Sequence, residues 1–226
     1  MSTTEPRLRR GVFITIEGID GCGKTTQLER LTARLRREGY PVEVTVEPGG
    51  TRIGEQIRRI LLDVRNQEIV PVTELLLYFA SRAQNVAEKI RPALEAGKVV
   101  VSDRYTDSTL VYQGVARGLG EEVVRRLHLI ACGGLDPDLT LYLDIDPDVG
   151  LARARDRNRG VQGDEAGQTR MDEQSADFYR RVRRGYLDLA RREPQRVRLI
   201  DASRGVAEVE RDVWAAVSAL LEKFHV

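Results

Sequence analysis

The sequence predicts an α/β fold with a five-stranded, mostly parallel sheet flanked by helices on both faces. Two observations lead to this prediction. Short apolar runs rich in β-branched residues alternate with segments whose leucines recur every three or four residues. The first apolar run, VFITIE at 12–17, ends in a glycine-rich loop that leads into such a segment, as in a parallel unit of strand, loop and helix.

Strands are predicted where short runs of valine, isoleucine and leucine are bounded by turn residues. After the first strand, they are expected at 41–47, 98–103, 139–145 and 196–201. Because alternating strands and helices favour a sheet covered on both faces, ligands are expected at the carboxyl ends of the strands.

Helices are predicted where apolar residues follow helical spacing. The first follows the glycine-rich loop and stops before Gly39, and the others are expected at 53–63, 73–97, 121–131 and 147–157. Pro92 is expected to interrupt the long helix, because its ring clashes with the preceding turn. Pro147 suits a first turn, where its missing N–H would have no partner.

The domain organisation follows from length and composition. The 226 residues are 41% hydrophobic, enough for a full core, and 11–226 are predicted to form a single domain after a flexible N-terminal tail at 1–10. The polar, glycine-containing segment 157–169 is expected to belong to a lid at about 153–172. No apolar run approaches the ~20 residues of a membrane-spanning helix, so no membrane segment is expected.

Charge is balanced, with 36 Lys and Arg against 35 Asp and Glu. This argues against the broad basic field that gathers nucleic acid or anionic membrane, so any anion site is expected to be local. The two cysteines lie far apart, and Cys22 is in the glycine-rich loop. Reduced thiols and a cytoplasmic location are therefore predicted.

The glycine-rich loop fits the phosphate-binding pattern G-x-x-x-x-G-K-[ST] from Gly18 to Thr25. Its position between a strand and a helix favours a nucleotide site, with Lys24 on the β- and γ-phosphates and the Thr25 hydroxyl on Mg²⁺. The residues predicted to bind ATP here are Gly18, Ile19, Asp20, Gly21, Cys22, Gly23, Lys24, Thr25 and Thr26.

Asp20 places a carboxylate inside this predicted phosphate site. In such a loop the backbone N–H groups turn toward the phosphates, so the Asp20 side chain is free to point outward, toward an acceptor. The alternative is a turn-stabilising aspartate that bonds its own backbone. The functional interpretation is preferred because Gly21 and Gly23 already permit the turn.

Two further pairs are candidates for ligand binding. Asp103 and Arg104 end the predicted strand 98–103, where the acid suits an Mg²⁺-water partner and the arginine could reach bound phosphates. Tyr78 and Arg82 share one helix face, as in the grip of a nucleobase by stacking and hydrogen bonding. The alternatives are a strand end that reaches solvent, a core tyrosine and a solvated arginine.

Five segments, in order, resemble the thymidylate kinase family: EGIDGCGKTTQ, EPGGT, LLLYFASRAQNV, SDRYTDSTLVYQG and FYRRVRRGYLDLA. The resemblance implies a phosphate-loop kinase fold and phosphoryl transfer from ATP·Mg²⁺ to dTMP, giving dTDP and ADP for dTTP synthesis. It also implies a homodimer whose partners are small molecules, with no nucleic acid and no membrane. Val46 departs from the family by replacing an arginine common in bacterial members.

The resemblance also implies roles for single residues. Arg58 and Arg104 would hold the acceptor's phosphate, Tyr78 would stack on thymine, Arg82 would donate to a thymine carbonyl, and Asp20 would take the 3′-hydroxyl. Tyr105 would pack against the deoxyribose. The predicted dTMP site comprises Asp20, Pro48, Arg58, Tyr78, Arg82, Arg104, Tyr105, Ser108, Thr109 and Gln113.

The loop has no arginine beside Lys24, so the cation for the transferred phosphoryl group is expected from the lid. Arg155 is the first choice and Arg153 is expected to stack on adenine, with Arg157 and Arg159 as further candidates. The predicted catalytic set is Asp20, Lys24, Arg104 and Arg155, with Thr25 and Asp103 toward Mg²⁺.

Two other functions remain open. A deoxynucleoside kinase would share the loop and the Asp-Arg pair but needs a general base for a neutral hydroxyl. A nucleotide-dependent switch or nucleic-acid-binding ATPase would use the basic runs at 8–10, 153–159 and 180–184, which a solvated helix face also explains.

Overall fold

The sheet has five strands in the order β2-β3-β1-β4-β5, and every neighbouring pair is parallel. The computed structural model describes residues 8–158, 170 and 174–225. The strands are β1 (Val12–Glu17), β2 (Val42–Val46), β3 (Val99–Asp103), β4 (Leu139–Asp144) and β5 (Val197–Asp201). All five predicted strands are confirmed within a residue or so at each end, and so is the fold class.

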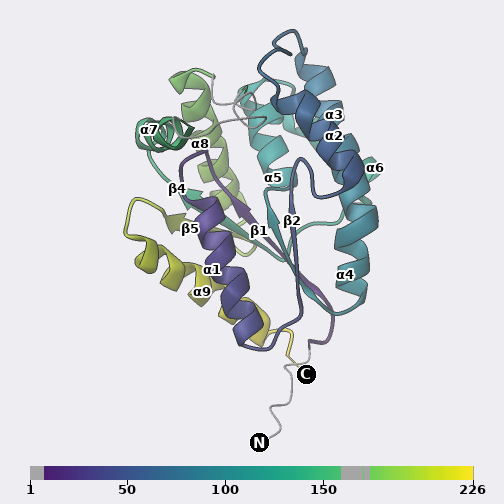
Figure 1. The fold of residues 1–226 in the computed structure, drawn as a ribbon, viewed down its shortest axis with the longest axis vertical. Helices are drawn as coiled ribbons and strands as arrows, with labels where there is room; N and C mark the ends of the chain where they lie inside the picture. Colours follow the sequence, from purple (N-terminus) through teal and green to yellow (C-terminus); the bar gives the residue numbers. More distant parts are fainter. Residues whose placement is uncertain (1–7, 159–169, 171–173, 226) are drawn as a thin grey trace, which may run out of the picture.

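Helices cover both faces of the sheet (Figure 1). The elements are α1 (Lys24–Arg37), α2 (Arg52–Leu62), α3 (Pro71–Asn85), η1 (Val86–Ile90), α4 (Arg91–Glu95), α5 (Thr106–Thr109), η2 (Leu110–Ala116), α6 (Glu121–Cys132), α7 (Pro147–Asn158), α8 (Ala176–Arg192) and α9 (Val206–Glu222). The predicted helices all occur. The sequence analysis assigned no element to 106–116, 176–192 or 206–222.

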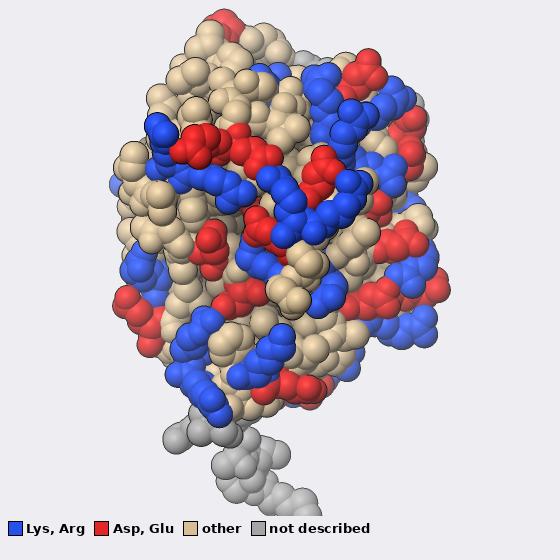
Figure 2. All heavy atoms as spheres, turned by 180° about the vertical axis from the view of Figure 1, so that it is seen from behind, with Lys and Arg blue, Asp and Glu red and all other residues tan. Residues whose placement is uncertain are grey.

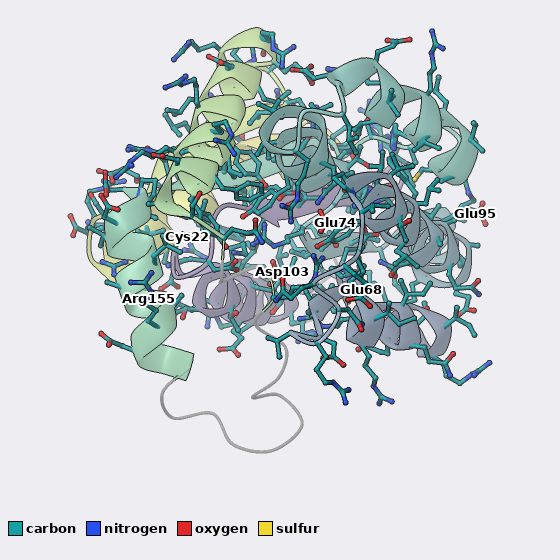
Figure 3. The ribbon with its side chains drawn as sticks, turned by 90° about the horizontal axis from the view of Figure 1, so that it is seen from above. Cys22, Glu68, Glu74, Glu95, Asp103 and Arg155 are labelled. Atoms are coloured by element: carbon teal, nitrogen blue, oxygen red, sulfur yellow. The ribbon has the colours of Figure 1, made fainter. Side chains whose placement is uncertain are left out.

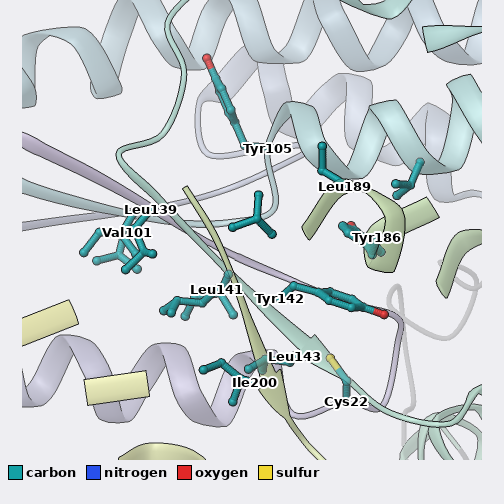
Figure 4. Packing of buried hydrophobic residues seen from close by; sticks show 14 of the residues in the cluster. Cys22, Val101, Tyr105, Leu139, Leu141, Tyr142, Leu143, Tyr186, Leu189 and Ile200 are labelled. Atoms are coloured by element: carbon teal, nitrogen blue, oxygen red, sulfur yellow. The ribbon is translucent and has the colours of Figure 1, made fainter. Parts of the chain in front are cut away.

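The core lies between the sheet and these helices. Successive strand residues point to opposite faces, and β4 shows the consequence (Figure 4). Tyr142 faces α8 and stacks on Tyr186 at 4.4 Å between ring centroids. Leu141 and Leu143 point to the other side of the sheet, where α1 lies. A strand buried on both sides is therefore apolar along its length, as the sequence predicted.

The register brings the carboxyl ends of β1, β2 and β3 to one edge of the sheet. Asp103 of β3 pairs with Ile16 of β1 and with Val46 of β2, and Glu17 of β1 pairs with Tyr142 of β4. The glycine-rich loop, the 47–51 loop and the turn at Arg104 all begin at this edge. It is where a parallel α/β sheet binds ligands.

The predicted interruption of the long helix occurs just before Pro92. The chain runs through α3, then the π-helical segment η1, then α4, in which Pro92 is the second residue. Proline has no N–H to continue the ladder and excludes a regular preceding turn. The helical run therefore continues with a change of hydrogen-bond pattern and does not break.

Part of the predicted N-terminal tail contacts the domain. Leu8 bridges His225, the Arg9 N–H donates to the Phe224 carbonyl, and Arg10 pairs with Asp138. Residues 1–7 lie outside the described part of the chain, as does most of the predicted lid, at 159–169 and 171–173.

Candidate active site

The glycine-rich loop between β1 and α1 is held in a conformation that needs glycine. Gly18, Gly21 and Gly23 have φ angles of 145°, 77° and 95°. A Cβ on Gly18 would lie 2.7 Å from the Leu143 carbonyl oxygen of β4, and one on Gly21 would lie 2.0 Å from that of Gly150 in α7. The loop is therefore seated directly against β4 and α7.

The Lys24 ammonium folds back over this loop. Its Nζ donates to the carbonyl oxygens of Gly18 at 3.1 Å and Ile19 at 3.0 Å, and lies 3.7 Å from the Asp20 carboxylate. These acceptors hold a buried charge that otherwise has no compensation. A bound polyphosphate would offer the same ammonium stronger, charged acceptors.

The start of α1 presents the predicted hydroxyl groups. α1 begins at Lys24, so Thr25 and Thr26 lie in its first turn, and both are exposed. Cys22 is buried, with its Sγ 3.9 Å from the Lys24 Nζ. Helix N-termini attract anions through free N–H groups and the helix dipole. This turn is therefore suited to phosphate and its metal ion.

The Asp20 carboxylate points out of the loop toward the neighbouring strand end. The Arg104 Nη2 lies 3.0 Å from the Asp20 Oδ1, and the Arg104 Nη1 donates to the Ser108 hydroxyl at 3.1 Å. Asp20 thus sits between the cations of Lys24 and Arg104. The contact joins the phosphate loop, which follows β1, to the end of β3, which pairs with β1 in the sheet.

Arg82 is 1% exposed and lacks one hydrogen-bond partner. Its Nε donates to Glu47 at 2.5 Å and its Nη2 to Thr109 at 3.0 Å, while its Nη1 has no partner among the described residues. The guanidinium also lies over the rings of Phe79 and Tyr105, at 5.0 and 5.2 Å from their centroids. A buried donor without a partner is costly, so this nitrogen is a candidate contact for a ligand.

Other residues of the predicted dTMP site lie around Arg82. Tyr78 is half-buried one turn earlier on α3, and burial raises its pKa to about 12, so its hydroxyl is neutral. The Gln113 side chain donates to Glu74 at 2.8 Å, and the Arg58 Nη1 donates to the Pro48 carbonyl at 2.8 Å. These contacts fix the Gln113 amide and tie α2 to the 47–51 loop.

Asp103 ends β3 with an unpaired oxygen. Its Oδ1 is buried without a hydrogen-bond partner within the described part of the chain. In the view onto the ligand edge, Asp103 lies between Arg155 on α7 and Glu74 on α3 (Figure 3). A carboxylate oxygen left free at this edge, together with the exposed Thr25 hydroxyl, fits Mg²⁺ and its waters. Among the described residues, no cluster of three or more His, Cys, Asp or Glu forms a dedicated metal cage.

The arginines of α7 flank the phosphate loop. A Cβ on Gly21 would lie 3.1 Å from the backbone nitrogen of Ala154, so this turn of α7 packs on the loop. Arg153 and Arg155, on either side of Ala154, are exposed. The side chain of Arg157 and the whole of Arg159 lie outside the described residues.

The Tyr105 side chain lies on the Arg82 side of the site, where the Arg82 guanidinium carbon is 5.2 Å from its ring centroid. Tyr105 is fully buried, edge to face with Phe13 at 4.9 Å. The tyrosine beside the loop is Tyr112, whose ring lies 5.2 Å from the Arg104 guanidinium carbon. The hydroxyl groups of Tyr105 and Tyr112 both lack a hydrogen-bond partner among the described residues.

Sequence reasoning missed three buried acids that hold the site together. Glu17 bonds the Tyr105 N–H, Glu47 bonds Arg82, and Glu74 bonds Gln113. Acids at strand ends usually reach solvent, so the sequence around Glu17 and Glu47 gave no sign of burial. Glu74 was detectable in principle, since it lies one turn before Tyr78 on the same helix face.

The fold and the site define a nucleotide-binding protein of the phosphate-loop class. Residues 16–213 match the family model described as thymidylate kinase. Three relatives bearing the name thymidylate kinase are about equally similar. That of Syntrophotalea carbinolica is 52% identical over 92% of this chain and 96% of its own length. Those of Deinococcus radiodurans and Geotalea uraniireducens are 50% and 51% identical, each over 93% of this chain and 98% of its own. The chain therefore belongs to the thymidylate kinase family, as the sequence motifs indicated.

Proposed function

We propose that the protein transfers the γ-phosphoryl group of ATP to dTMP, giving dTDP and ADP for dTTP synthesis. The observation that supports this most directly is the 3.0 Å contact between Asp20 and Arg104. It joins the loop that would hold the donor's phosphates to the strand end that would hold the acceptor's phosphate. Family membership supplies the identity of the acceptor.

On the donor side, the backbone of Gly18–Gly23 wraps the polyphosphate and Lys24 leaves its carbonyl partners for the β- and γ-phosphates. The ATP site includes Arg153, exposed on α7. When Mg²⁺ is bound with ATP it neutralises charge on the transferred group. Thr25 would ligate it, and the free Oδ1 of Asp103 would orient its water.

On the acceptor side, Arg58 and Arg104 hold the phosphate and Asp20 accepts the 3′-hydroxyl. Tyr78 stacks on the base and the free Nη1 of Arg82 donates to a thymine carbonyl. The rest of the acceptor site is Pro48, Ser108, Thr109 and Gln113. Tyr105 lies against Arg82 and Tyr112 against Arg104, and both hydroxyls lack a partner within the described part of the chain, so both tyrosines are candidates to pack against the deoxyribose.

The arrangement favours a phosphorylated acceptor over a nucleoside. A neutral hydroxyl needs a general base, and the buried acid nearest Arg104 and Ser108 is Glu17. Both of its oxygens already accept hydrogen bonds, from the Tyr105 N–H and from the Ser108 and Tyr186 hydroxyls. A phosphate is itself an anionic nucleophile and needs charge neutralisation only. A deoxynucleoside kinase is therefore less well supported.

A nucleic-acid-binding ATPase is also less well supported. On the face opposite to that of Figure 1, Lys and Arg are interspersed with Asp and Glu (Figure 2). The basic run at 180–184 is partly neutralised, because Arg180 pairs with Asp177 and Asp148 and Arg183 pairs with Asp144. Interleaved charges of this kind are typical of a solvated helix face.

A coupled assay of ADP production tests the proposal. The purified protein with ATP and Mg²⁺ is given dTMP, dUMP, dCMP, AMP or thymidine in turn. Fast ATP consumption with dTMP, and little without an acceptor, is expected. Turnover with thymidine but not with dTMP would establish the nucleoside kinase instead, and slow acceptor-independent hydrolysis would establish a switch.

Replacement of Arg82 by alanine is expected to raise the KM for dTMP by roughly ten-fold to a hundred-fold, because a base carbonyl loses its buried donor. The KM for ATP should change little. Steady-state kinetics with each substrate varied in turn measures both. Arg82→Lys is the matched variant: it keeps a charge beside Glu47 but lacks the planar fork, so it should bind dTMP weakly as well. A change confined to the KM for ATP contradicts the assignment.

We also propose that two copies of the chain associate. Exposed apolar side chains occur on α3 and α6, which pack against each other, and include Leu76 at 51% and Ile130 at 81% exposure. Exposed apolar groups on adjacent helices favour a protein interface. Light scattering should give the mass of a dimer, and Leu76→Arg should give a monomer. Val206→Arg, at a similarly exposed position on α9, is the control and should stay dimeric.

A cytoplasmic location remains a prediction. Cys22 and Cys132 are both free and buried, which supports a reducing compartment. None of the described helices is long and apolar enough to cross a membrane.

A further inference from the structure

Glu17 is a buried carboxylate to which the proposed mechanism gives no step. It is the last residue of β1 and is fully buried. Its Oε1 accepts the Tyr105 N–H at 2.8 Å, and its Oε2 accepts the Ser108 hydroxyl at 2.5 Å and the Tyr186 hydroxyl at 2.8 Å. The donors come from the turn after β3, from α5 and from α8. A single acid thus ties three parts of the chain to the end of β1.

The direction of these hydrogen bonds is set by the carboxylate. An ionised carboxylate can only accept, and the Ser108 and Tyr186 hydroxyls, which lie 2.9 Å apart, both donate to Glu17. The Ser108 lone pairs are then free to accept the Arg104 Nη1, which lies 3.1 Å from the hydroxyl oxygen. Glu17 therefore turns Ser108 into an acceptor aimed at Arg104.

Glu17 also helps to fix the backbone at Arg104. Arg104 is the one non-glycine residue with positive φ in the described part of the chain, at 69°. Its N–H donates to the Ile16 carbonyl at 3.0 Å, and its carbonyl accepts the Ser102 hydroxyl at 2.7 Å. The next N–H, that of Tyr105, is the one held by Glu17. A left-handed residue persists only where its surroundings fix it, so these bonds set the direction in which Arg104 leaves the strand.

We propose that Glu17 is a positioning residue: through Ser108 and the Tyr105 N–H it orients the Arg104 guanidinium that binds the acceptor's phosphate. The inference rests on the proposed function, which gives Arg104 this contact. The competing explanation is that Glu17 only joins β1 to α8 and stabilises the fold. That role would affect both substrates equally, whereas positioning of Arg104 affects the acceptor alone.

The primary test is Glu17→Gln, which keeps the shape of the side chain but supplies an N–H donor on one side. The amide N–H can donate to Ser108, which then loses a lone pair toward Arg104. At about pH 8, kcat/KM for dTMP is expected to fall by roughly ten-fold or more, the loss typical of one misplaced charge-assisted hydrogen bond. The KM for ATP should stay within about two-fold of the parent value.

A matched pair of tyrosine variants keeps the test valid if Glu17→Gln does not fold. Tyr186 and Tyr142 stack on each other, and each donates its hydroxyl to a carboxylate, Glu17 and Asp144 respectively. Tyr186→Phe should lower kcat/KM for dTMP, whereas Tyr142→Phe should not, although each loses one hydrogen bond to an acid. Equal effects of the two variants would overturn the inference.

The double variant Glu17→Gln with Ser108→Ala tests the route to Arg104. If Glu17 acts through Ser108, the double variant should be little worse than the worse single variant, whereas independent roles would add. Arg104→Ala separates the two proposals. If it leaves the KM for dTMP unchanged, the proposed role of Arg104 fails. If it weakens dTMP while Glu17→Gln does not, only the positioning inference fails.

Discussion

Arg155→Met is expected to lower kcat on the order of 10²-fold or more while leaving the affinity for dTMP nearly intact. The phosphate loop has no arginine beside Lys24, and charge that develops on the transferred phosphoryl group needs a cation. An arginine supplied for this purpose is worth about 10³–10⁵ in rate. The structure adds that the α7 turn around Ala154 packs on Gly21 of the loop, and that Arg155, the next residue, is exposed.

Two matched variants sharpen this test. Arg153→Met, one residue before Ala154, should raise the KM for ATP and spare kcat, because Arg153 is proposed to stack on adenine. Arg180→Met removes an exposed arginine from α8, where it pairs with Asp177 and Asp148, and should change neither constant. Single-turnover rates separate the chemical step from product release. Arg157 and Arg159 are tested in the same way. If every lid variant keeps kcat within a few-fold of the parent, the catalytic cation lies outside this segment.

The strands and the phosphate loop were predictable because their signals are local. A run such as VFITIE followed by glycines and Lys-Thr specifies a strand, a loop and a helix start without knowledge of the rest of the chain. The final helix was predictable too, since Val209, Val213, Val217 and Leu221 repeat every four residues and form its buried face. The sequence analysis did not assign it.

The connections between the site residues were not predictable, because they depend on packing between distant segments. Glu17 bonds Tyr186, which lies 169 positions away, and nothing near either residue signals the contact. Tyr105 and Tyr112 illustrate the same limit. Both follow the Asp-Arg pair and both are buried, and only the fold decides that the Tyr105 ring lies beside Arg82 and the Tyr112 ring beside Arg104.

Glu17 is also expected to make stability depend on pH. Burial raises its pKa from 4.5 to about 7, with Asp107 adding to the rise, while Arg104 and the Ser108 and Tyr186 hydroxyls oppose it. Between these two values the folded protein binds a proton that the unfolded chain does not. The contribution of this proton to stability is therefore complete below about pH 4.5 and is lost as the pH rises to about 7. The shift corresponds to about 3 kcal/mol.

Urea unfolding of the parent and of Glu17→Gln across this range measures that contribution, because other titrating groups cancel in the difference. As the pH rises from about 4.5 to 8, the free energy of unfolding of the variant should increase by about 3 kcal/mol relative to that of the parent. If the difference in unfolding free energy between variant and parent stays constant with pH, the hydrogen bonds from the Tyr105 N–H and the Ser108 and Tyr186 hydroxyls fully compensate the buried charge. With the expected slope, ionised Glu17 destabilises the fold at the pH where it orients Arg104. A buried carboxylate that is kept for function is expected to lower the stability of the fold, because it is needed in its charged form. A buried carboxylate with a purely structural role is not expected to lower it.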